Sequence, residues 1–102
     1  MSVEQEKDIR AREIQNRTDQ ALKLLKSATT KDEMLRAFVS IFWIQKEFQM
    51  HDTEWSKFLA AHPEIAPEME NASIRVTGRA AFNIEEIMAM DEQMRNTKGA
   101  DA

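Results

Sequence analysis

The side chains best suited to acid–base or metal chemistry lie in one stretch of the sequence, where two histidines stand among carboxylates. These residues are Glu47, His51, Asp52, Glu54 and His62. A protein zinc site needs three or four converging ligands that are held in place by further hydrogen bonds. Di-iron helical proteins use a Glu-x-x-His motif, which this sequence lacks. We therefore predict no metal and no other cofactor, and we expect His62 to be partly buried and hydrogen-bonded beside Trp55.

Adjacent acidic pairs, at residues 85–86 and 91–92, are the remaining candidates for catalysis. Neighbouring positions of a helix point in different directions, so neither pair converges on one substrate atom. The glycines of the chain, Gly78 and Gly99, do not form a phosphate-binding loop. Cysteine is absent, and nothing marks the third, orienting partner that serine or histidine catalysis requires. The sequence therefore predicts no catalytic residue and a protein that is not an enzyme.

A long apolar pattern in the C-terminal third suits binding rather than chemistry. Pro67 fits the first turn of a helix, and Glu68 and Glu70 favour its positive end, so the pattern predicts one helix from about 67 to 95. Side chains spaced alternately by four and three form a heptad seam along it: Met69, Val76, Ala80, Asn83, Ile87, Met90 and Met94. Such a seam predicts self-association, most simply as a symmetric dimer, in which the polar Asn83 can set the register.

A second apolar strip runs beside this seam. It consists of Ile74, Ala81, Phe82, Ile84 and Met88. Seam and strip together make an apolar arc wider than one neighbouring helix usually covers. The strip either packs against a second neighbour within the fold or binds another protein chain. Binding to another protein chain is our hypothesis for function, because so small a fold has limited capacity to bury both the seam and the strip.

Gly78 is the weak point of the predicted C-terminal helix. A glycine in a helix interior costs about 1 kcal/mol relative to alanine. Residues 73–77 also alternate between apolar and polar side chains, as a short strand would. A break near Gly78 is therefore the main alternative to a continuous helix.

Three further helical segments precede this region. The first spans about residues 3–27, where Ser2 and Gln5 have the spacing of a capping box. Its residues 1–13 are mostly polar and are expected to project or fray, whereas apolar spacing from Ile14 onward predicts docking. Thr30 is suited to cap a second helix over about 31–50, which is apolar on nearly every side and is expected to be central.

The third helix is short. Asp52 or Thr53 can cap it, and Pro63 should end it near Ala61. The predicted fold class is therefore all-α, a small bundle of three or four helices. One domain is expected over residues 1–102, with a mobile tail at 96–102.

Charge and composition limit the classes of partner. The 102-residue chain carries a net charge of -4, and residues 51–102 hold five Lys/Arg against ten Asp/Glu. An acidic surface repels phosphate backbones, which counts against direct nucleic-acid binding. No run approaches the roughly 20 apolar residues of a membrane span, and the N-terminus lacks the pattern of a secretion signal. We therefore expect no membrane partner and a cytoplasmic location.

The leading functional hypothesis is a non-enzymatic module that binds another protein through the apolar strip. It would act as an adaptor, an assembly factor or an inhibitor of a larger protein machine. The alternative is an acidic mimic of nucleic acid, in which carboxylates of residues 47–70 and 85–92 occupy the basic groove of a DNA- or RNA-binding protein. The sequence does not identify the partner chain in either case.

Overall fold

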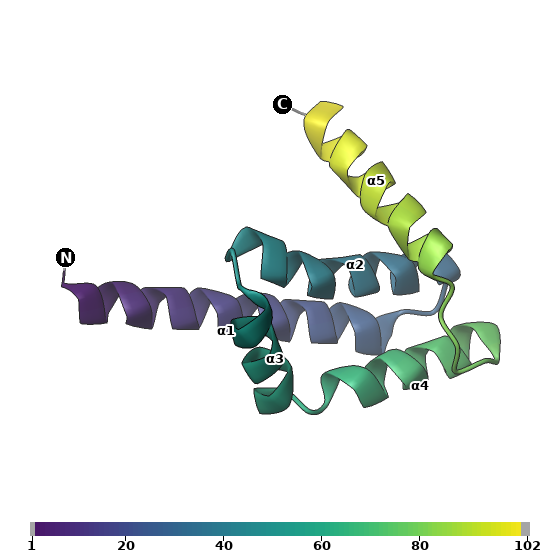
Figure 1. Cartoon of the computed structure of the whole chain (residues 1–102). Coiled ribbons are helices and arrows are strands. Elements are labelled where there is room, and N and C mark those ends of the chain that lie inside the picture. The colour runs from purple at the N-terminus through teal and green to yellow at the C-terminus, as the bar shows by residue number, and fades with distance from the viewer. Residues whose placement is uncertain (1, 101–102) are drawn as a thin grey trace.

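The structure is a computed structural model that describes residues 2–100, with side chains through residue 97. The described residues form five helices and no strand: α1 (Val3–Ser27), α2 (Lys31–Glu47), α3 (Asp52–Ala61), α4 (Ile65–Thr77) and α5 (Ile84–Ala100) (Figure 1). The all-α prediction is confirmed. The prediction of three or four helices is wrong, because the C-terminal segment forms two helices where one was expected.

Local hydrogen bonds explain where the first two helices begin. The Gln5 N–H donates to the Ser2 hydroxyl at 3.2 Å, and the Ser2 N–H donates to the Gln5 side chain at 3.2 Å, so the predicted capping box is present. The Glu33 N–H donates to the Thr30 hydroxyl at 3.2 Å. Each cap satisfies a donor that the first helical turn would otherwise leave unpaired.

The core is organised around α2, which packs against α1, α4 and α5. The largest fully buried side chains include Leu25 from α1 and Phe38, Val39 and Ile41 from α2. Arg75 of α4 donates to the carbonyl oxygens of Leu25 and Ala28 at 2.9 Å each. This cation satisfies carbonyls at the C-terminal end of α1, where the helix dipole favours positive charge, and it ties α4 to α1.

The continuous helix predicted from about 67 to 95 is wrong, and the chain turns at Gly78 instead. Gly78 has φ of 79°, a left-handed conformation that glycine adopts without strain, and its N–H donates to the Ile74 carbonyl at 2.8 Å. After the linker of residues 78–83, the Asn83 side chain accepts the Glu85 N–H at 2.9 Å and so begins α5. Gly78 is suited to ending a helix and Asn83 to starting the next one. Together these two local signals outweigh the heptad spacing. Residues 73–77 belong to α4 and not to a strand.

The break at Gly78 also divides the predicted seam. Its members lie on α4 (Met69, Val76), in the linker (Ala80, Asn83) and on α5 (Ile87, Met90, Met94). Met69, Ile87 and Met90 are buried in the core of the single chain, and Val76 and Met94 pack against that core. A coiled-coil seam along one helix therefore does not exist.

The ends of several helices differ from the predicted bounds. Helix α2 stops at Glu47 rather than near residue 50, and α4 begins at Ile65, two residues before Pro67. Helix α5 continues through residues 96–100, which were assigned to a tail, and residues 101–102 lie outside the described part of the chain. Figure 1 shows the N-terminal end of α1 and the C-terminal end of α5 extending beyond the other helices.

Replacing Gly78 by alanine tests the turn. We expect Gly78→Ala to lower the free energy of unfolding by about 1–2 kcal/mol, because a Cβ is strained in the left-handed region. Steric crowding does not contribute, since an added Cβ would meet nothing within 4 Å. Urea unfolding measures this loss of stability. Gly78→Asn should lower the free energy of unfolding less than Gly78→Ala does. An alanine variant as stable as the original chain would show that Gly78 is helical.

Candidate functional site

The two histidines and their carboxylate neighbours do not form a chemical site. The two ring nitrogens of His62 lie 3.0 Å from the Phe58 carbonyl oxygen and 3.3 Å from the Gln15 side-chain oxygen, and the ring packs on Phe58 at 4.5 Å. His62 is partly buried, whereas His51 is exposed. Within the described residues, no three His, Asp or Glu side chains come together in a way that could hold a metal ion. His62, Glu47 and Glu54 instead make contacts between helices or within one helix.

The acidic pairs at 85–86 and 91–92 also act in contacts between helices. Glu86 pairs with Lys31 of α2 at 2.8 Å. Asp91 pairs with Arg95 at 2.7 Å and accepts the indole N–H of Trp43. Neighbouring positions of a helix point in different directions, so Glu85 does not point with Glu86, nor Glu92 with Asp91. The arrangement fastens α5 to α2 and brings no two of these acids onto a common substrate.

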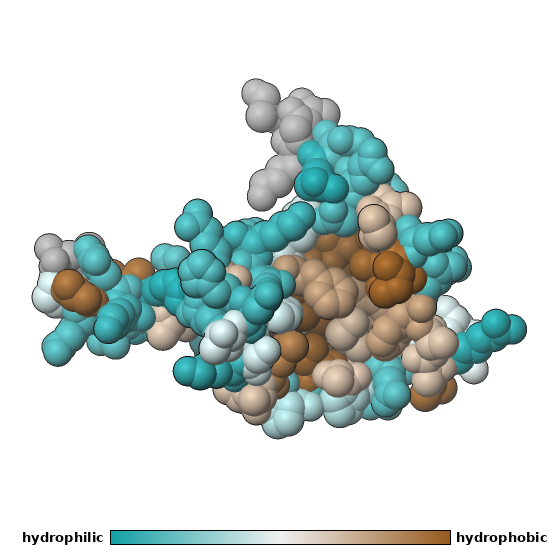
Figure 2. All heavy atoms as spheres, viewed as in Figure 1, coloured by the Kyte–Doolittle hydropathy of each residue, from teal (hydrophilic) through white to brown (hydrophobic). Residues whose placement is uncertain are grey.

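A contiguous apolar face is the most distinctive surface of the molecule. Figure 2 shows hydrophobic side chains gathered where α2, α3, α4 and the first turns of α5 adjoin. The large hydrophobic side chains that these elements and the linker leave exposed define the apolar face: Phe42, Leu59, Ile74, Phe82, Ile84 and Met88. Ile84 and Met88 are the most open, at 67% and 64% exposure. They lie one turn apart on α5, on the side away from the Glu86 carboxylate.

A hollow in this face lies between α2, α3 and α4. Its volume is about 280 Å³, and its lining consists of Ile41, Phe42, Trp55, Leu59, His62, Pro63, Ile65, Ala66 and Met69. All of these side chains are apolar except the His62 imidazole. Trp55 stacks on Phe58 with ring centroids 5.1 Å apart, which holds the α3 wall of the hollow in place.

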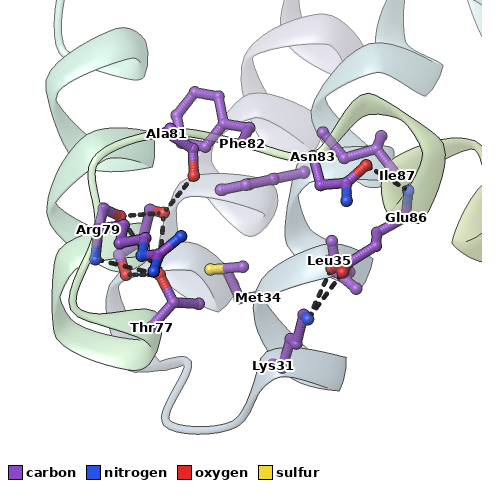
Figure 3. Close-up of a pocket in the computed structure, with 12 residues that line it drawn as sticks. Lys31, Met34, Leu35, Thr77, Arg79, Ala81, Phe82, Asn83, Glu86 and Ile87 are labelled. Carbon is purple, nitrogen blue, oxygen red and sulfur yellow. Dashed lines mark hydrogen bonds and ion pairs between the residues drawn. The ribbon is translucent and has the colours of Figure 1, made fainter.

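The linker crosses from α4 to α5 over α2 and encloses a second cavity, of about 460 Å³ (Figure 3). Phe82 anchors the linker edge-on against Phe38, with ring centroids 4.9 Å apart. The buried Ser73 hydroxyl donates to the Arg79 carbonyl at 2.5 Å and lies 3.3 Å from the Ala81 carbonyl. Figure 3 shows Met34 between this network and the Lys31 side chain. Hydrogen bonds and one aromatic contact therefore hold the linker in a defined path.

All five residues of the predicted binding strip are exposed. Ile74 lies on α4, Ala81 and Phe82 lie in the linker, and Ile84 and Met88 lie on α5. The turn at Gly78 bends the strip but does not bury it.

Sequence reasoning missed Phe42 and Leu59. The apolar run 37–44 predicted a helix covered on all sides, yet the three neighbours of α2 leave Phe42 43% exposed. The signal for Leu59 was present in α3, a ten-residue helix that places several large apolar groups on one side. Such a helix is too short to bury them all against the core.

One ion pair stabilises the corner between α1, α2 and α3. Arg10 donates to both Glu54 carboxylate oxygens, at 2.8 and 3.2 Å, and to the Phe48 carbonyl at 2.7 Å. The hydrogen bond from Arg10 lowers the pKa of Glu54 below its ordinary value of 4.5. Hydrogen bonds from the Thr30 and Thr29 hydroxyls lower the pKa of Glu33 in the same way. Both sets of contacts join residues of the same chain.

No protein-family model, curated protein or solved structure matches the chain. None of the described helices combines the length and the apolar character needed to cross a bilayer. The function is therefore inferred from the chain's own surface.

The Arg10–Glu54 pair gives a pH-dependent prediction. Because the pKa of Glu54 is lowered by folding, the pair stabilises the fold above about pH 4.5 and this contribution is lost as the pH falls through the lowered pKa. Carboxyl-carbon NMR titration should show a depressed midpoint for Glu54 that rises in Arg10→Gln. Arg12→Gln, on the same helix, is the matched control and should leave the midpoint unchanged. An equal midpoint with and without Arg10 would contradict the pairing.

A second prediction concerns the linker. Ser73→Ala removes the hydroxyl that holds the Arg79 and Ala81 carbonyls, so it should reduce the free energy of unfolding by about 1 kcal/mol and speed amide exchange in residues 79–83. Ser27→Ala is the control, because that hydroxyl donates to Leu24 at an exposed position and its loss should be nearly neutral. Equal effects of the two substitutions would show that Ser73 does not position the linker.

Proposed function

We propose that the protein is a non-enzymatic interaction module that binds another protein chain through its apolar face. The observation that carries the proposal is that α2, α3, α4, the linker and α5 leave six large hydrophobic side chains exposed, while Figure 2 shows hydrophobic surface gathered where these elements adjoin. Single exposed hydrophobic residues are common on protein surfaces, whereas a contiguous group marks a site of interaction. An adaptor, an assembly factor or an inhibitor of a larger protein machine would each use such a face.

The shape of the face suits a few strong anchors. The hollow of about 280 Å³ can receive a large apolar side chain of a partner, while Ile84 and Met88 stand out beside it. Full burial of such a side chain contributes about 1.5–3 kcal/mol. Anchors that fill well-packed pockets dominate the energy of most protein interfaces. Methionine adapts its shape to a partner, which favours Met88 as one of these anchors.

The charges around the face favour apolar docking over mimicry of nucleic acid. Three acids of the C-terminal half, Glu54, Glu86 and Asp91, are paired with Arg10, Lys31 and Arg95. A carboxylate that is paired within the fold is a poor substitute for a phosphate. Glu64, which precedes α4, and Glu70 on α4 are exposed, and such carboxylates suit a partner with a basic rim.

Affinity capture from a lysate of the source cells tests the proposal, with the intact protein as bait. A partner held by the original chain should be lost at least tenfold with Met88→Ala or Phe82→Ala, since burial of one anchor is worth more than 1.4 kcal/mol. Met88 is the cleaner site, because Phe82 also packs on Phe38. Leu24→Ala is the control: Leu24 is 52% exposed on α1, outside the apolar face, and should not affect capture.

Salt separates the two candidate mechanisms. Capture through apolar anchors should change little when ionic strength is raised, whereas capture through carboxylates that imitate phosphates should collapse. A partner that dissociates in high salt but is retained by both face variants would contradict apolar docking and support the nucleic-acid mimic.

A further inference from the structure

The linker between α4 and α5 closes one side of a cavity whose size suits a small molecule. The cavity has a volume of about 460 Å³, within the range of about 300–1,000 Å³ that is usual for ligand sites. Its twelve lining residues come from α2, α4, the linker and α5, and half of them are apolar. Sites for small ligands combine such an apolar wall with a few polar groups that fix the orientation of the ligand.

The floor of the cavity consists of apolar side chains that belong to the core. Met34, Leu35 and Phe38 of α2 and Ile87 of α5 form this floor, and all four are buried. Apolar surface of a ligand that lies on the floor is removed from water, which is favourable in proportion to its area. The floor therefore favours an occupant with a hydrocarbon part.

The polar groups that hold the linker wall of the cavity already have partners. The Ser73 hydroxyl donates to the Arg79 carbonyl at 2.5 Å, and the Thr77 hydroxyl donates to the Ser73 carbonyl at 2.7 Å. The Asn83 side chain accepts the Glu85 N–H at 2.9 Å. A wall that is fixed in this way does not have to be ordered when a ligand binds, which lowers the cost of binding.

The charges of the lining favour an anion. Lys31 is paired with Glu86 at 2.8 Å, so these two charges offset each other. The Arg79 guanidinium also lines the cavity, and it makes no hydrogen bond or ion pair with any residue that the structure describes. Figure 3 shows Met34 between the Arg79 side of the cavity and the Lys31 side chain. One uncompensated positive charge therefore lies beside an apolar floor, in a chain whose net charge is -4.

We propose that the linker cavity binds a small carboxylate with an apolar tail of about eight carbons, such as a medium-chain fatty acid. The planar Arg79 guanidinium donates two parallel hydrogen bonds to the carboxylate, a geometry that suits this pair of groups. The tail lies on the floor that includes Met34 and Phe38. The bound ligand joins the linker to α2 and so restrains the segment that leads into α5. Phe82 is the one member of the apolar face among the lining residues, and the site does not rest on the proposed function.

Methionine-methyl NMR during titration with octanoate tests the site. Met34 lines the linker cavity and Met69 lines the hollow between α2, α3 and α4, so their methyl signals report on different cavities. Saturable shifts, and nuclear Overhauser effects from the octanoate chain, should appear at Met34 and not at Met69. Acetate lacks the tail and octylammonium carries the opposite charge, so the dissociation constant of each should be higher by at least roughly tenfold.

Variants of Arg79 test the assigned charge, and the exposed position of this side chain makes them compatible with the fold. Arg79→Gln should weaken octanoate binding roughly tenfold, the scale of one charge-assisted hydrogen bond, and Arg79→Lys, which keeps the charge, should weaken it less. Lys57→Gln is the control, because Lys57 is an exposed cation of α3 that does not line the cavity, and it should leave the affinity unchanged. The proposal would be overturned by the absence of saturable binding, by equal affinities for octanoate and octylammonium, by shifts at Met69 in place of Met34, or by an Arg79→Gln variant that binds as the original chain does.

Discussion

The left-handed turn at Gly78 is the constraint on which the surface of this protein depends. It ends α4 at Thr77, and the Ser73 hydroxyl then holds the chain over α2 until Asn83 starts α5. As a result, α4 packs against α1 and α2 while α5 packs against α2 from another direction. In a straight helix Met69 and Ile87 would lie along one face, whereas the turn brings them into the core from two separate helices, α4 and α5. The turn therefore divides the apolar residues of the C-terminal third between a core and an exposed face.

The small size of the chain explains why the division is incomplete. A fold of about 100 residues buries a smaller fraction of its surface than a larger domain does, so each helix has few neighbours to cover it. The core takes buried side chains from α1, α2, α4 and α5, with the largest share from α2, and the linker covers Phe38 with Phe82. Phe42, Ile84 and Met88 remain outside because no further element of the described chain reaches them. The same shortage of neighbours produces the apolar face.

The sequence predicted most of the local structure, and the five residues of the predicted strip are exposed. Capping residues such as Ser2 and Thr30 act through contacts within three residues, so their positions could be read from spacing alone. The structure of the C-terminal segment could not be read from spacing, because Gly78 and Asn83 each fit two roles. Asn83 suits both a polar position in a heptad seam and the start of a helix, and a glycine such as Gly78 costs a helix interior only about 1 kcal/mol relative to alanine. The turn at Gly78, the cap at Asn83 and the packing of both helices on α2 together favour the broken helix, and that packing cannot be read from periodicity.

The central claim is that the apolar face, and Met88 above all, is open in the isolated chain and is covered by another chain. Methionine-methyl NMR in the presence of a soluble paramagnetic probe measures this exposure directly. At high dilution the Met88 methyl signal should broaden strongly, while those of Met69 and Met90, which are 7% and 5% exposed, should not. With a captured partner, Met88 should become protected. A Met88 signal protected even in the dilute monomer, or broadened equally under all conditions, would contradict the account.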